Sequence, residues 1–279
     1  MLGALLFALA AAPPPLQVGV TLQPYYSWTA SLAAGLPIDV IAVLPGEVDP
    51  GNYQPRPADV ARLEHLDVLV INGLGHDDFI TGMLEASGNT HCKVLRINAA
   101  TALLQSHDGG AVNSHTFLSF TNAIQQTYLL ARTLSEQRPA LAPALQKNAT
   151  AYAGALRAQR KAAVQALAHA RTRRVITVHD GYGYLLQELG LELVDVVEPA
   201  HGLLPSAAEL SAVLGRLDAE PVKVVLAEAQ FPPALLELLE QHGARVVTVS
   251  HIAVGRYEAG RFQREMQANV DALVAALVP

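Results

Sequence analysis

The chain has little cysteine, no concentration of positive charge and no motif of a familiar enzyme. Its 279 residues include one cysteine, Cys92, which excludes an intramolecular disulfide and a thiolate-rich metal cluster. The formal net charge is −6 at pH 7, so nucleic acid is not a predicted partner. There is no G-x-S-x-G motif, and the Gly73-x-Gly75 pair lacks the third glycine of a dinucleotide-binding loop. We therefore predict a protein that binds without catalysing a reaction.

The chain also lacks a hydrophobic run long enough to span a bilayer at its start. Residues 2–12 are apolar and end in three alanines before three prolines, a pattern that suits signal-peptidase cleavage. No cysteine follows this run, which excludes a lipid anchor at that point. We expect residues 1–12 to be a signal peptide and the mature protein to be soluble, monomeric and periplasmic.

The sequence does contain enough apolar residues for two lobes. The apolar content is 51%, and the length exceeds the roughly 100–200 residues of a typical domain. Strand and helix patterns alternate both before and after the middle of the chain. The predicted fold class is α/β, with two doubly wound α/β lobes joined by one long rigid helix and a ligand cleft between the lobes. We place the N-terminal lobe at residues 13–138, the linker helix at 139–173 and the C-terminal lobe at 174–279.

The linker helix is predicted from composition and periodicity. Residues 141–171 consist mainly of Ala, Leu, Gln, Arg and Lys, and about thirty such residues would span about 45 Å. Apolar side chains recur at helical spacing, which indicates one buried face. They are Leu145, Ala149, Tyr152, Leu156, Val164 and Leu167.

Histidines follow several of the predicted strands. His76 lies in the loop after a buried strand at 66–71, His179 directly follows a strand at 174–178, and His251 follows one at 244–249. Ligands in open α/β sheets bind beyond the carboxyl ends of the strands. These loops are therefore the predicted ligand site.

Five motifs, in order along the chain, resemble one known family. Residues 43–59 resemble D-P-H-x-Y-E-P-x-P-S-D, residues 113–118 resemble N-P-H-x-W-L, and residues 179–184 resemble H-D-A-F-x-Y. Residues 205–210 and 227–231 fit P-S-A-x-E-L and A-E-x-Q-F. The family is the periplasmic metal-binding proteins of ABC importers for zinc, manganese and iron. The resemblance implies a metal ion held between two lobes and delivered to an inner-membrane ABC permease and its ATPase.

The resemblance also implies metal ligands, and two of the family's positions are changed here. His115 and His179 match ligand positions of the family. The histidine of the first loop is replaced by Gly51, with Asn52 beside it, and the late aspartate is replaced by Ser250.

Two other histidines can supply the missing ligands. His76 can fill the gap left at Gly51, and His251 can reach the site in place of Ser250. The predicted ligands are therefore His76, His115, His179 and His251. We expect Asp180 and Glu228 to orient or cap the ligands, and Ser250 and Asn52 to line the cleft.

The predicted ligands indicate which metal ion the protein binds. A histidine site completed by water suits the octahedral preference of Fe(II) or Mn(II), whereas four tight protein ligands suit Zn(II). We predict one divalent ion, with Fe(II) or Mn(II) favoured over Zn(II). The alternative is a binder of a metal chelate of the siderophore type, or a metal-free adhesin or partner-binding subunit on the same fold. The loss of the histidine at Gly51 supports that alternative.

Overall fold

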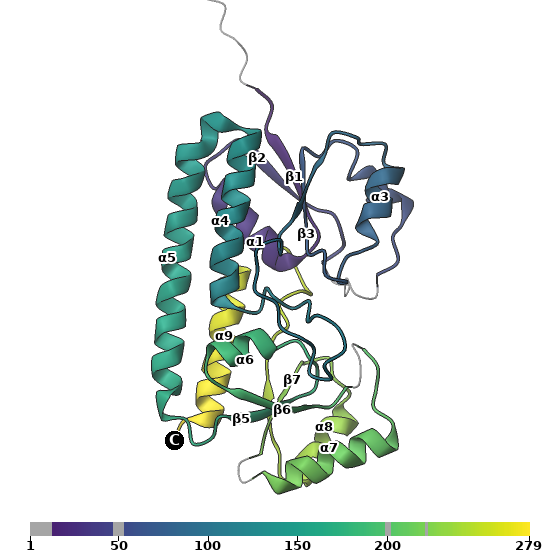
Figure 1. Ribbon diagram of the computed structural model, residues 1–279, viewed down its shortest axis with the longest axis vertical. Coiled ribbons are helices and arrows are strands. Elements are labelled where there is room, and N and C mark those ends of the chain that lie inside the picture. The colour runs from purple at the N-terminus through teal and green to yellow at the C-terminus, as the bar shows by residue number, and fades with distance from the viewer. Residues whose placement is uncertain (1–12, 47–52, 199–201, 221–222) are drawn as a thin grey trace, which may run out of the picture.

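The computed structural model describes residues 13–46, 53–198, 202–220 and 223–279. Two four-stranded parallel sheets lie one above the other in the view of Figure 1, with long helices running beside both. The strand orders are β2-β1-β3-β4 and β6-β5-β7-β8, so the two lobes repeat one topology. The predicted fold class is confirmed. The predicted signal peptide, Gly51 and Asn52 lie outside the described residues.

The N-terminal lobe alternates strands and helices. Its elements are β1 (Leu16–Val20), α1 (Gln23–Ala33), β2 (Ile38–Ala42), α2 (Pro57–Ala61), β3 (Val68–Ile71), α3 (Ile80–Ala86) and β4 (Lys93–Arg96). All four residues of β3 are buried, because helices or loops cover both faces of a parallel sheet. The loops that leave β3 and β4 carry His76 and His115.

The C-terminal lobe repeats this pattern. Its elements are β5 (Arg174–Thr177), α6 (Gly183–Glu188), β6 (Glu192–Val196), α7 (Ala207–Ala219), β7 (Val224–Ala227), α8 (Pro233–Gln241) and β8 (Arg245–Thr248). Helix α7 begins with a capping box, in which Ser206 and Glu209 each accept a hydrogen bond from the other's backbone N–H. His179 follows β5 and His251 follows β8.

Three long helices run beside the two sheets: α4 (Phe120–Gln137), α5 (Ala142–Ala166) and α9 (Arg261–Leu277). Helix α5 has 25 residues and is therefore shorter than the predicted 141–171. The chain turns sharply before it, because Arg138 precedes Pro139 and has a non-helical conformation, with φ −139° and ψ 78°, that ends α4. At the other end, α5 passes into a 3-10 turn, Leu167–His169. The linker is thus one arm of a helical hairpin rather than an isolated strut.

The largest hydrophobic core is continuous across the molecule. It includes Leu16 and Val18 of the first sheet, Val175 and Val224 of the second, and the buried face of α5. Each lobe adds a smaller cluster of its own. The two lobes therefore share apolar packing along the helices.

The segment 250–260, which follows β8, connects the C-terminal lobe to the N-terminal lobe. Gly255 donates its backbone N–H to the carbonyl of Gly46, and the Tyr257 hydroxyl donates to the carbonyl of Thr21 at 3.3 Å. The Ser27 hydroxyl donates to the carbonyl of Glu258 at 2.6 Å. His251 is therefore carried on a segment fastened to both lobes. Within the described part of the chain, no helix combines the length and apolar character needed to cross a bilayer.

Candidate metal centre

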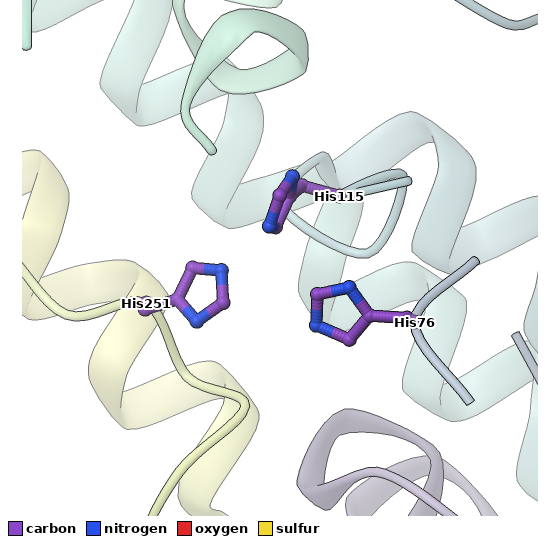
Figure 2. A group of neighbouring side chains, drawn as sticks. All are labelled: His76, His115 and His251. Carbon is purple, nitrogen blue, oxygen red and sulfur yellow. The ribbon is translucent and has the colours of Figure 1, made fainter. Parts of the chain in front are cut away.

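Four buried histidines meet where the two lobes face each other. Figure 2 shows His76, His115 and His251 with their rings turned toward a common centre, and one ligand atom from each lies within 4.8 Å of the others. His179 joins them, with its Nε2 3.1 Å from Nε2 of His115. The exposed fractions of the four are between 3% and 6%. The structure thus brings together all four histidines proposed from the sequence.

His115 occupies the middle of this four-histidine cluster. Its ring centroid lies 4.9 Å from that of His76 and 4.8 Å from those of His179 and His251. Each lobe contributes two histidines, since His76 and His115 follow strands of the first sheet and His179 and His251 follow strands of the second. An ion bound by all four would join the lobes.

Asn113 fixes the orientation of His115. The side-chain Nδ2 of Asn113 donates a hydrogen bond to the backbone carbonyl of Asp180 at 2.7 Å. The side-chain Oδ1 of Asn113 is therefore the acceptor that faces His115. That oxygen accepts from the backbone N–H of His115 at 3.0 Å and lies 2.9 Å from its Nδ1. Nδ1 therefore carries the proton, and the lone pair of Nε2 faces the other histidines.

Glu198 performs the corresponding role for His179. Its Oε2 lies 3.4 Å from Nδ1 of His179, and both side chains are largely buried. A carboxylate at this nitrogen favours the tautomer with the proton on Nδ1 and leaves Nε2 for a metal. The Thr177 hydroxyl fixes the backbone here by donating to the carbonyl of His179 at 2.8 Å.

The loop that carries His76 is held by a buried carboxylate. Asp77 accepts hydrogen bonds from the Thr21 hydroxyl at 2.6 Å and from the backbone N–H groups of Asn72 and Gly73 at 2.7 and 2.9 Å. Burial raises the pKa of Asp77, and these hydrogen bonds oppose the rise. Asp77 ties the loop to the end of β1 and so sets the position of His76.

Ser114 links the loops of the two N-terminal histidines. Its Oγ lies 3.1 Å from Nδ1 of His76, and its backbone carbonyl accepts from the Asn72 side chain at 3.0 Å. His76 thus uses Nδ1 for a protein contact, as His115 and His179 do. Three of the four imidazoles are oriented through the same nitrogen.

His251 reaches the site because the backbone turns directly after it. Ile252 has φ 65° and is the one non-glycine residue with a positive φ among those described. Ser250 is directed elsewhere: its hydroxyl donates to Glu265, and its backbone N–H and carbonyl bond the Asn269 side chain at 2.7 and 2.8 Å. Ser250 therefore anchors the turn rather than lining the ligand cluster.

Asp180 and Glu228 lie around the cluster. The Asp180 carboxylate accepts from the backbone N–H of His107 at 2.8 Å, and burial raises its pKa. Glu228 accepts from the Tyr182 hydroxyl at 2.8 Å. Neither is part of the group of converging ligand atoms found among the described residues.

A cavity of about 420 Å³ adjoins the cluster on the side of His115 and His179. Its walls include the carboxylates of Asp108, Asp180, Asp195 and Glu198. These carboxylates place negative charge beside the histidine cluster.

Sequence reasoning missed Asn113, Ser114 and Glu198. Asn113 and Ser114 were visible only as neighbours of His115 in its motif. Glu198 follows β6, so the rule that placed His179 at the carboxyl end of β5 applies to it as well. An acidic residue at the carboxyl end of β6 was therefore the signal in the sequence that could have identified Glu198.

Comparison with known proteins identifies the family. The protein-family model for ZnuA, which is described as "Zinc-uptake complex component A periplasmic", matches residues 18–276 of this chain. The solute-binding protein FpvC from Pseudomonas aeruginosa, with structures in complex with Mn²⁺ and Ni²⁺, has a TM-score of 0.87. It is 40% identical, and the match covers 94% of this chain and 98% of the Mn²⁺-complex chain.

Two further relatives carry zinc in their names. The high-affinity zinc uptake system protein ZnuA of Bacillus subtilis is 25% identical over 226 residues, which cover 76% of this chain and 70% of that protein. The zinc-binding lipoprotein AdcA of Streptococcus pneumoniae is 24% identical over 239 residues, or 81% of this chain. The match covers 48% of AdcA, so this chain spans about half its length. The chain belongs to the ZnuA family of periplasmic metal-binding solute-binding proteins.

Proposed function

We propose that this protein is the periplasmic substrate-binding protein of a metal ABC importer. It captures one divalent transition-metal ion with His76, His115, His179 and His251 and delivers the ion to an inner-membrane permease and its ATPase, without catalysing a reaction. The observation that carries the proposal is the convergence of four buried imidazoles, two from each lobe. Metal-ligating histidines usually hold their second ring nitrogen against a protein partner, as three of these four do at Nδ1.

The cargo we favour is Fe(II) or Mn(II) over Zn(II). Four imidazoles leave two positions of an octahedral ion for water, and Fe(II) and Mn(II) accept six ligands. The FpvC structures contain Mn²⁺ and Ni²⁺, which supports a site of this kind in a 40% identical relative. The affinity order of divalent metals favours zinc, so this preference must come from geometry.

The test is an anaerobic titration of the mature protein, from Pro13, with Fe(II), Mn(II) and Zn(II) in turn. Trp28 fluorescence follows binding, and elemental analysis gives the stoichiometry. The expected result is one tightly bound ion per chain, with binding lost in a His115→Ala/His179→Ala variant. Binding should also weaken below about pH 6, because imidazoles must be deprotonated to ligate.

The matched control is a His65→Ala/His91→Ala variant, since both of these histidines are exposed and outside the cluster. It should bind the ion as the unmodified protein does. If no free ion binds to the unmodified protein, the metal-carrier proposal is wrong, and a chelate or a protein partner becomes the better account. If Zn(II) binds most tightly and stays bound against excess Fe(II) and Mn(II), only the metal preference is wrong.

A further inference from the structure

Gly181 lies against two of the four histidines. A Cβ atom built on Gly181 would be 2.8 Å from Cδ2 and 3.1 Å from Nε2 of His179, and 3.2 Å from Cδ2 of His251. Carbon atoms in favourable contact are about 3.5–4.0 Å apart. The backbone of Gly181 has no positive φ, so the conformation itself would accept a side chain. The missing side chain matters here only because of the space it leaves.

His179 has little freedom to move away from such a side chain. Its Nδ1 faces Glu198 at 3.4 Å, its Nε2 faces His115 at 3.1 Å, and its exposed fraction is 3%. His251 is held by the turn at Ile252 and by the bonds that Ser250 makes with Asn269. A methyl group at 181 would therefore displace a metal-binding nitrogen rather than a surface atom.

We infer that Gly181 is the specificity-determining residue that allows His179 and His251 to ligate the same ion. This inference rests on the proposed function and extends it: with any larger residue at 181, the site becomes one of three imidazoles. The substrate class that Gly181 selects is then a divalent ion that accepts four nitrogen donors.

The experiment compares Co(II) binding to the unmodified protein and to Gly181→Ala, His179→Ala and the double variant. Co(II) is the probe because its visible absorption reports the number and type of its ligands. Gly181→Ala should weaken Co(II) binding by about tenfold or more and shift the spectrum toward that of His179→Ala, because the two closest contacts of the added methyl group are with His179. The double variant should bind as His179→Ala does, because the two changes remove the same ligand.

The matched control is Gly183→Ala, two residues further along the chain. A Cβ atom there would meet its nearest neighbours, Asn113 Nδ2 and Leu104 Cδ1, at 3.9 and 4.0 Å. This variant should keep the affinity and spectrum of the unmodified protein. Circular dichroism of each metal-free variant checks that it folds.

The outcomes separate this inference from the proposed function. If the unmodified protein binds no Co(II), the proposed function fails. If that protein binds Co(II) and Gly181→Ala binds it with the same affinity and spectrum as Gly183→Ala, only the role of Gly181 is overturned. If the losses of Co(II) affinity caused by the two single changes add up in the double variant, the role of Gly181 is overturned too. If Gly181→Ala does not fold, the double variant is compared with His179→Ala: equal binding supports the inference and weaker binding overturns it.

Discussion

Single side chains decide which atom of each histidine is available. Asn113, Ser114 and Glu198 each contact the Nδ1 atom of one imidazole, and His115 and His179 then face each other through Nε2. Three of the four histidines are thus oriented by neighbouring side chains that are not themselves proposed ligands. Losing such a partner usually costs 10- to 100-fold in metal affinity.

Glu198 offers a direct test of this arrangement. Glu198→Gln should weaken metal binding by about tenfold, because it removes the negative charge beside Nδ1 of His179. The control is Glu192→Gln, which alters an exposed ion pair with Arg174. The measurement is the same titration used for the unmodified protein. Equal affinities for the two variants would contradict the role assigned to Glu198.

Cys92 gives a prediction about pH. Partial burial raises the pKa of its thiol to about 11, and the charge of Asp67 adds to the rise. A raised pKa favours the neutral thiol in the folded state, so its contribution to stability is present below the unfolded pKa of about 8.5 and is lost as pH rises toward 11.

The measurement for Cys92 is its rate of alkylation in the folded protein. We expect slow alkylation at pH 8 and a rate that rises steeply above about pH 10, because the thiolate is the reactive form. Denatured protein should react readily at pH 8. Equally fast alkylation of folded and denatured protein at pH 8 would show an ordinary exposed thiol.

The sequence predicted which histidines come together better than it predicted the side chains around them. His115 and His179 were identified by motif, and His76 and His251 by their position after buried strands. Gly181 was read only as part of a motif, because its importance depends on two rings that come from distant parts of the chain. Side chains that support a site through contacts of this kind leave no periodic or local signal.

Among the elements, the start of α4 is built around one residue of another element. Glu188, at the end of α6, accepts from the backbone N–H groups of Phe120 and Thr121 at 2.7 and 2.9 Å and from the Ser119 hydroxyl at 3.1 Å. It also accepts from Arg160 of α5 at 2.8 Å. A carboxylate at a helix N-terminus interacts favourably with the helix dipole. Glu188 therefore joins α4, α5 and α6.

Glu188→Ala should lower the free energy of unfolding by about 2 kcal/mol, because it leaves the backbone N–H of the buried residue Phe120 without its acceptor and removes the ion pair with Arg160. The matched control is Glu136→Ala, which removes an exposed pair with Arg132 and should change stability by less than about 0.5 kcal/mol. Urea denaturation measures both. A similar small change in the two variants would show that Glu188 is not a structural link.

Local chemistry sets some element boundaries. Helix α7 begins at the capping box of Ser206 and Glu209, in which both hydrogen bonds are present. The linker helix was predicted too long, because the helix-favouring composition of residues 141–171 continues past Ala166, where the chain passes into a 3-10 turn. Packing against α4 was not predicted, since composition does not identify the partner of an apolar face. The division of the chain at residues 139 and 173 stays a prediction.

At the scale of the whole molecule, the lobes are held together by more than a hinge. The continuous core and the segment 250–260 both connect them. We therefore expect metal binding to cause a small rocking motion rather than wide closure, because wide closure would break buried contacts.

Small-angle X-ray scattering with and without the ion tests this expectation. The radius of gyration should stay near the value of about 19 Å expected for a chain of this length in both states. The His115→Ala/His179→Ala variant, measured with the ion present, provides the control. A clear decrease on metal addition, absent in that variant, would indicate a wide closing movement.

The packing of α9 also bears on when the protein can fold. This final helix lies against α1, and Phe262 of α9 meets Trp28 of α1 with ring centroids 5.3 Å apart. The core of the first lobe is therefore incomplete until the last seventeen-residue helix is present. A chain that emerges N-terminus first, from a ribosome or through a secretion channel, cannot finish its first lobe on the way. The packing of the first lobe would be completed only after α9 has emerged.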